Sequence, residues 1–174
     1  MNRQSSRYGL FAAMIGTAMI VMFILTYLNT FQLSHVRWSE TRVYMTFLMG
    51  AAMAVIMLSF MWGMYDNRRV NVAIYLSSMV VFVAALYLVR SQTTVQDSSY
   101  MRAMIPHHSI AILTSERSQI DDLRVRELAD GIIEAQRREI KEMNWLINDI
   151  RENGEATTQA EKEARPVPEF SAEP

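Results

Sequence analysis

Three long apolar segments occupy most of the first half of this 174-residue chain. They run from Tyr8 to Leu28, from Val43 to Met64 and from Val70 to Val89. A helix of about 20 residues crosses a hydrocarbon core about 30 Å thick, because it rises about 1.5 Å per residue. We therefore expect an all-α chain in which residues 1–92 form a three-helix membrane anchor surrounded by the lipid bilayer.

The first apolar segment follows a short basic stretch, as a secretory signal peptide does. Its apolar run exceeds the about 7–15 residues typical of signal peptides, and no small-x-small cleavage site follows it. Bulky residues from Leu25 to Asn29 stand where such a site would lie. The segment is therefore interpreted as a retained anchor.

The charges are distributed unevenly along the chain. Up to Val89 the only acidic residues are Glu40 and Asp66, whereas from Arg90 onward acidic residues outnumber basic ones. This distribution argues against a nucleic-acid binder with a basic surface. With the N-terminus in the cytoplasm, the inner side would hold four arginines and the outer side three: Arg3, Arg7, Arg68 and Arg69 against Arg37, Arg42 and Arg90. The positive-inside rule thus places the C-terminal domain at the periplasmic face of the inner membrane.

The polar second half has the pattern of a helical hairpin. One helix is expected from Asp97 to Arg117 and the next from Asp122 to Arg151, which defines a domain over residues 93–153. Residues 154–174 are rich in Glu, Ala and Pro and have little to bury, so this tail is expected to be disordered.

The second apolar segment carries a methionine at every fourth position, the Met45–Met61 stripe: Met45, Met49, Met53, Met57 and Met61. Four residues advance about 400° around a helix, so the methionines form a slowly winding stripe. A row of thioethers could pass a soft ion such as Cu(I) along the helix. Alternatively, these adaptable apolar side chains simply fill irregular helix contacts.

A second methionine group lies in the hairpin, close to two histidines. On a helix Met101, Met104 and His108 share one face, and His107 lies about 100° away at its edge. Thioether and imidazole ligands suit copper, with Met preferring Cu(I) and His serving either oxidation state. Ordinary core packing explains the same spacing, since Met at helical intervals is common in cores. Pro106 is expected either to start a new helix or to kink a continuing one.

The second hairpin helix supplies a complementary apolar face. Gln136 and Glu139 lie within that face, and a buried amide or carboxylate must find partners. They could form a structural hydrogen-bond network, or Glu139 could orient His107 or His108, or bind metal itself. Met143, one turn beyond Glu139, could complete a ligand set.

These residues together form an extended motif. It reads Asp97-x-x-Tyr100-Met101-x-x-Met104-Ile105-Pro106-His107-His108-x-x-Ala111, followed by Leu128-Ala129, Gln136, Glu139-Ile140 and Met143-x-Trp145-Leu146. It resembles the family known as domain of unknown function 305, whose members resemble ferritin-like helical bundles and are associated with copper binding in the bacterial envelope. The resemblance covers about Asp97 to Ile150. Ser109 and Leu113-Thr114 depart from the family pattern, which commonly has Gln and a further Met there.

The resemblance implies a copper site, for Cu(I) or Cu(II), with Met104, His107, His108 and Met143 as candidate ligands and Met101 beside them. Family members often carry the hairpin twice, and this chain has one copy. A single hairpin is half of a four-helix bundle and cannot bury a full core, so a homodimer is expected.

Two classes of function remain after these observations. One is a membrane-anchored protein that binds or buffers copper, and the other is an interaction module that dimerises or docks a partner. An enzyme is not expected, because ferritin-like di-iron sites use Glu-x-x-His pairs and the sequence contains none.

Overall fold

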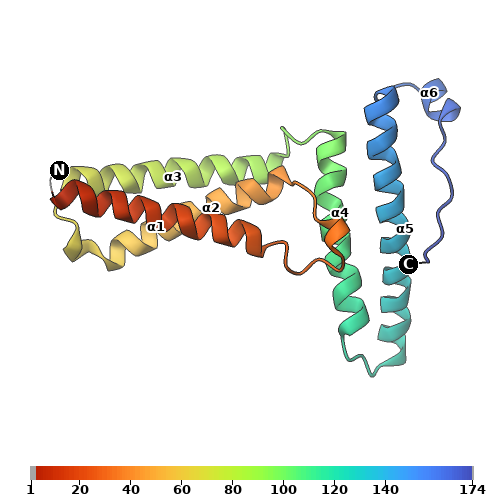
Figure 1. Cartoon of the computed structure of the whole chain (residues 1–174), viewed down its shortest axis with the longest axis horizontal. Helices are drawn as coiled ribbons and strands as arrows, with labels where there is room; N and C mark the ends of the chain where they lie inside the picture. Colours follow the sequence, from red (N-terminus) through yellow and green to blue (C-terminus); the bar gives the residue numbers. More distant parts are fainter. Residues whose placement is uncertain (1–2, 174) are drawn as a thin grey trace. The chain divides into compact units, whose positions relative to one another are not determined.

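The computed structural model describes residues 3–173 of the chain. Met1, Asn2 and Pro174, which belong to the predicted anchor and tail, lie outside the described residues. The described residues form helices and no strand, which confirms the all-α prediction. The α-helices are α1 (Arg3–Leu25), α2 (Glu40–Phe60), α3 (Arg68–Ser91), α4 (Asp97–Arg117), α5 (Leu123–Asn153) and α6 (Gln159–Ala164), and two short 3-10 turns are η1 (Leu33–His35) and η2 (Trp62–Met64) (Figure 1).

The chain divides into two compact units. The three-helix unit contains the residues up to Leu28 and Glu40–Val95, and the hairpin unit contains Asn29–Ser39 and the residues from Gln96 onward. Residues 29–39 connect the first two long helices along the chain. The structure assigns this loop to the hairpin unit, because its polar groups bond with residues of α4 and α5.

In the three-helix unit, α2 packs against both α1 and α3. Its small residues allow a close approach: a Cβ placed on Gly50 would clash with the side chain of Met19 from α1. Leu58 of α2 is fully buried, in a cluster with Phe11 and Tyr65. A substitution that enlarges Gly50 would therefore push α1 away unless the flexible Met19 side chain moved.

A small polar network lies at one end of this unit. The Tyr8 hydroxyl donates to Asn71 Oδ1 at 2.7 Å, and Asn71 Nδ2 donates to the carbonyl of Tyr65 at 2.9 Å. The Asn67 side chain accepts from the backbone amides of the first turn of α3, which is the capping that begins a helix. These bonds satisfy Asn71, which is 1% exposed.

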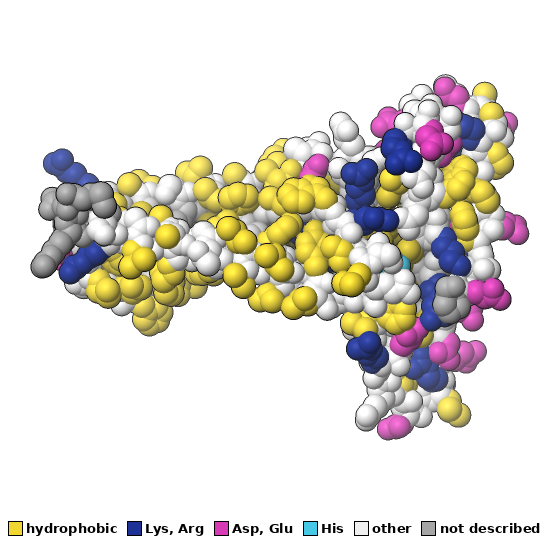
Figure 2. All heavy atoms as spheres, viewed as in Figure 1, with side chains coloured by type: hydrophobic (Ala, Val, Ile, Leu, Met, Phe, Trp, Pro, Cys, Tyr) yellow, Lys and Arg dark blue, Asp and Glu magenta, His cyan; other side chains and the backbone are white. Residues whose placement is uncertain are grey.

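All three helices of this unit are long and apolar enough to cross a membrane. The qualifying stretches are Ser6–Leu25, Glu40–Phe60 and Arg68–Ser91. Figure 2 shows hydrophobic side chains along the surface of these helices, and many of them, such as Phe60 at 88%, are exposed. An apolar surface of this extent needs a nonpolar environment, so three candidate spans of the predicted length are present.

The bounds of the three long apolar helices differ from the prediction. The first helix ends at Leu25 instead of Leu28, because the Thr26 hydroxyl donates to the carbonyl of Phe23 at 2.6 Å and the Arg42 guanidinium donates to the carbonyl of Thr26. Side-chain donors thus bond to these carbonyls in place of the backbone amides that a further helical turn would supply. The second helix begins at Glu40 and ends at Phe60, and residues up to Met64 form a turn and η2.

The methionine stripe spreads along α2 and just beyond its end. Met45 is 39% exposed, and the other four are partly buried. Met57 and Met61 pack against the buried cluster around Leu58. Part of the stripe therefore contributes to ordinary helix packing.

In the hairpin unit, α4 and α5 lie antiparallel, side by side (Figure 1). Asp122 caps α5 by accepting from the Arg124 amide, as the sequence predicts, and α5 ends at Gly154, whose φ of 78° suits a residue without Cβ.

The segment after Gly154, whose composition predicts disorder, contains a short helix and several local contacts. Thr158 and Glu161 form a capping box that begins α6. Arg165 pairs with Asp149 at 2.7 Å, and Lys141 donates to the carbonyl of Glu173 at 2.6 Å. The polar composition that predicted disorder here supplies the side chains of these local bonds.

Candidate metal site

The helix that carries the predicted ligands is continuous. Helix α4 contains Pro106 in its interior, so this residue neither begins a new helix nor ends the preceding one. Pro106 has no N–H to donate to the carbonyl of Arg102, which weakens the helix locally. Its ring is fully buried, and this burial favours the proline at this position.

Three of the predicted ligands lie in one apolar cluster between α4 and α5. Met101 is 7% exposed and Met143 is 9% exposed, and Met104 packs against the same cluster while remaining partly accessible. Ile105 and Ile140 complete the contact between the helices. The structure thus brings together thioethers that are about 40 residues apart in the sequence.

His108 lies beside this cluster and is held at both ring nitrogens. Its Nδ1 is 3.0 Å from the carbonyl oxygen of Met104, and its Nε2 is 2.7 Å from Glu139 Oε2. The His108 side chain is 12% exposed, whereas that of Glu139 is 41% exposed. A carbonyl only accepts, so Nδ1 carries a proton, and Nε2 is the nitrogen that faces the carboxylate.

His107 occupies a different position from His108. Its side chain is exposed, and the two ring centroids are 6.3 Å apart. Among residues 3–173, no three His, Cys, Asp or Glu side chains come together closely enough to hold a metal ion. Any metal site at this position therefore depends on the thioethers as well as on His108 and Glu139.

Gln136 and Glu139 lie at the edge of the core, in contrast to the fully buried positions that the periodicity predicts. Both are partly buried. Of the two histidines that Glu139 was predicted to orient, it pairs with His108. Gln136 forms no hydrogen bond with the described residues, and its partial exposure leaves it accessible to water.

The loop of residues 29–39 adds a third histidine to the hairpin unit. The Phe31 amide donates to Ser109 Oγ at 2.7 Å, and His35 Nδ1 lies 2.9 Å from the same oxygen. Burial, followed by the positive charge of Arg37, lowers the pKa of His35 below 6.5. The His35 ring and the Ser109 hydroxyl form a hydrogen bond in which either group can donate, depending on the tautomer of a neutral His35.

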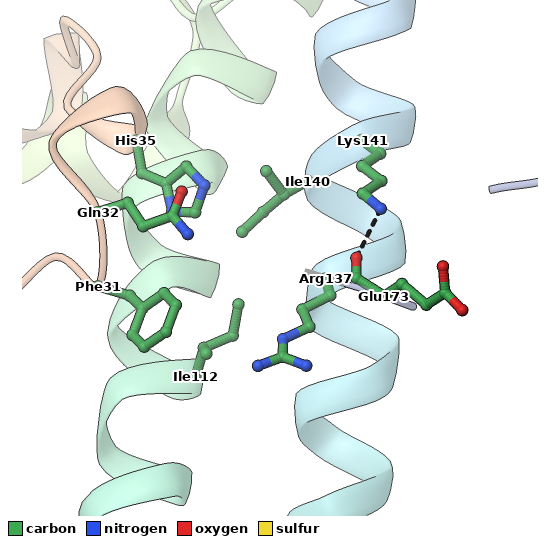
Figure 3. Close-up of a pocket in the computed structure, with 8 residues that line it drawn as sticks. All are labelled: Phe31, Gln32, His35, Ile112, Arg137, Ile140, Lys141 and Glu173. Atoms are coloured by element: carbon green, nitrogen blue, oxygen red, sulfur yellow. Dashed lines mark hydrogen bonds between the residues drawn. The ribbon is translucent and has the colours of Figure 1, made fainter. Parts of the chain in front are cut away.

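A small cavity of about 110 Å³ separates this loop from the hairpin helices. Figure 3 shows Phe31 and His35 on the loop side, Ile112 on α4, and Ile140 on α5. Lys141 reaches past the cavity to the carbonyl of Glu173, so the tail closes one side.

Sequence reasoning did not single out His35 or Ser109. His35 is in a loop without periodicity, and Ser109 was noted only as a departure from the family motif. The predicted number of spans could have indicated a contact between the first loop and the hairpin. If three helices span the membrane, both lie on the same side of it. Ser109 is fully buried and central to the loop contact.

Comparison with known proteins relates the chain to one family. The family described as "Domain of unknown function (DUF305)" matches residues 90–171, which include α4, α5 and α6. The chain is 31% identical over 144 residues to "Uncharacterized protein L153" of Acanthamoeba polyphaga mimivirus, an alignment that covers 79% of this chain and 93% of that protein. No solved structure matches the chain. The chain therefore belongs to the domain of unknown function 305 family.

Proposed function

We propose that this chain is a membrane-anchored protein that binds or buffers copper through its helical hairpin. The observation that carries the proposal is the convergence of Met101, Met104 and Met143 from two helices, with His108 beside them. Thioether sulfur and imidazole nitrogen are the donors that Cu(I) prefers among protein groups available without cysteine. The donor set therefore fits copper.

His108 is arranged as metal-binding histidines usually are. Metal-bound imidazoles commonly donate their second N–H to a backbone carbonyl or carboxylate, which fixes the ring orientation. The Met104 carbonyl provides this acceptor at Nδ1 and leaves Nε2 for a metal. Because Nε2 must lose any proton before it binds a metal, Glu139 at 2.7 Å is placed to accept that proton or to join as a ligand.

The exposed His107 adds a more accessible donor next to the cluster. The buried thioethers of Met101 and Met143 resemble core side chains, whereas Met104 and His107 are within reach of solvent. An ion arriving from solution would first meet His107 and Met104.

We also propose that the hairpin unit is on the periplasmic side of the inner membrane, with the N-terminus in the cytoplasm. The charge bias of the loops supports this orientation. The contact of the loop at residues 29–39 with α4 fits three spans in either orientation, because two spans separate the loop from the hairpin and put both on one side. The chain contains no cysteine, so single cysteines introduced by Gln119→Cys and Gly63→Cys report the two sides directly. Labelling of the second but not the first by an impermeant maleimide on intact cells would refute the orientation.

A homodimer remains part of the proposal. Three apolar side chains near the start of α5 are exposed, namely Leu123, Val125 and Leu128. Pairing two hairpins into a four-helix bundle would cover such residues. These residues also favour the second candidate function, an interaction module without metal. Cross-linking in membranes that recovers only monomer would contradict the homodimer.

The decisive experiment is copper titration of the full chain in detergent. Cu(I) affinity is measured by anaerobic competition with a chromophoric chelator, for wild type and for Met104→Leu, His107→Asn and His108→Asn. Leucine preserves the volume of methionine, so the fold is retained while the donor is lost. Met79→Leu on α3, where the side chain is exposed, is the matched control. Failure of the wild type to bind, or unchanged affinity in all three variants, would refute the metal function and leave the interaction module.

A further inference from the structure

Besides the small cavity next to His35, the hairpin unit contains a larger hollow. Its lining differs in chemical character from the methionine cluster. Its volume is about 490 Å³, and it is lined by residues from the loop at 29–39, from α4 and from α5. Each of these segments contributes one arginine: Arg37, Arg102 and Arg151. None of the described residues that line the hollow is acidic.

The three guanidinium groups have little compensation from the described residues. Arg102 is exposed and forms no hydrogen bond or ion pair with them. Arg37 donates to Asn144 Oδ1 at 3.1 Å, a neutral acceptor that positions the guanidinium without cancelling its charge. Among the described residues, Arg151 pairs only with Glu152, at 3.4 Å, and both side chains are about two-thirds exposed, at 68% and 67%. Exposed pairs of this kind contribute little.

The chemistry of the hollow fits a phosphate group. Guanidinium presents a planar fork of N–H donors that pairs with phosphate oxygens, and three such groups around one hollow favour an anion with several acceptors. The Asn148 amide has no partner among the described residues and adds a further donor. Val36 and Trp38 provide an apolar side to the same hollow.

Two residues that line this hollow, Arg37 and Trp38, are close along the chain to a candidate membrane span. Arg37 precedes Glu40, the first residue of α2, by three residues. Three residues extend at most about 11 Å, so Arg37 lies within that distance of the beginning of α2. Trp38 is even nearer and is 61% exposed. Tryptophan next to a span is typical of the membrane interface.

We propose that this hollow binds the phosphate headgroup of an anionic phospholipid in the membrane that anchors the chain. The inference rests on the anchoring part of the proposed function and is independent of copper. Free phosphate shares the chemistry, but the apolar side formed by Val36 and Trp38 and the short distance to α2 favour a lipid. The bound lipid would tie the loop at 29–39 and the hairpin helices to the membrane surface.

The experiment uses the full chain, purified and delipidated in a non-ionic detergent. Native mass spectrometry follows binding of phosphatidylglycerol and of phosphatidylcholine, with inorganic phosphate as a separate competitor. The test variant combines Arg37→Gln, Arg102→Gln and Arg151→Gln. A control removes the same charge elsewhere on the hairpin unit through Arg117→Gln, Arg124→Gln and Arg138→Gln. Copper affinity and carbonate extraction from membranes are measured for both variants.

The wild type is expected to prefer phosphatidylglycerol, and the test variant to lose on the order of 100-fold in affinity for it. The control variant should retain its affinity within about twofold, since its arginines lie outside the hollow. Equal losses in both variants, no preference between the lipids, or full displacement by millimolar phosphate would each overturn the proposal. Release of the wild type from membranes by carbonate would refute the membrane anchoring itself. If the chain does not bind copper but still selects phosphatidylglycerol, only the metal function is refuted.

Discussion

The two methionine groups of this chain differ in how their sulfur atoms are arranged. On α2 the stripe from Met45 to Met61 covers 16 residue steps, or about 24 Å along a helix. In the hairpin, Met101, Met104 and Met143 come from two helices and share one cluster. A periodic row on one helix distributes side chains along an axis, whereas two antiparallel helices bring distant residues to one point. In the second group, a histidine on the same helix bonds to the backbone carbonyl of Met104 and to Glu139 of the facing helix.

The largest expected effect comes from removing the aliphatic packing of the hairpin cluster. Ile105 is fully buried between α4 and α5, so Ile105→Ala should cost about 2–5 kcal/mol of hairpin stability through lost burial and the remaining cavity. Hydrogen–deuterium exchange on the full chain in detergent should accelerate at amides of α4 and α5 and stay unchanged at α2. Accelerated exchange in both units would show that the two regions unfold together. It would contradict the separate stability of the hairpin and the three-helix unit.

The next effect separates the two methionine groups directly. The double variant Met104→Leu and Met143→Leu should lose Cu(I) affinity by about 100-fold or more, since loss of even an outer hydrogen-bond partner costs about 10- to 100-fold. The matched variant Met49→Leu and Met53→Leu on α2 should stay within twofold of wild type, about the precision of chelator competition. A larger loss from the α2 variant would assign copper binding to the stripe.

A smaller effect is expected from Glu139, which contacts His108 and lies outside the apolar cluster. Glu139→Gln keeps the size of the side chain and removes its charge, so Cu(I) affinity should fall about 10-fold. Identical affinity in the variant would assign Glu139 to structure alone.

The smallest effect concerns the loop at 29–39 and its histidine. The pKa of His35 is lowered below 6.5 by burial and then by Arg37, so the unfolded chain binds this proton more readily than the folded chain. The stability from His35 is complete above pH 6.5 and is lost as pH falls through 6.5 toward the folded pKa. Between pH 7.5 and 5.5, wild type should lose more thermal stability than His35→Asn. A parallel decline in both would refute the role of His35.

Much of the hairpin could be predicted from local sequence. Helix α4 occupies the predicted residues, and α5 begins at the predicted Asp122 cap, because apolar periodicity and capping residues act over a few positions. The family was also recognisable, since its motif lies almost entirely on these two helices. The predicted end of α1 was wrong because the side chains of Thr26 and Arg42 bond to carbonyls at its end, and the bounds of α2 also differ from the prediction.

The candidate site was predicted in composition but not in arrangement. Spacing on one helix placed Met101, Met104 and His108 on a common face, yet it could not choose between His107 and His108 as the partner of Glu139. That choice depends on how α5 is rotated against α4. The contact of His35 with Ser109 joins residues 74 positions apart, and no local pattern encodes such a pair.

Composition and periodicity alone established three apolar helices of membrane-spanning length, a polar helical hairpin and a Met/His motif, because burial of apolar surface and helix geometry are properties of short segments. The packing of α4 against α5 established which methionines share one cluster and which histidine reaches Glu139, and the loop at 29–39 packed on these helices established which arginines surround one hollow. These features require side chains from separate segments at distances of a few ångströms, and only the folded chain brings them there.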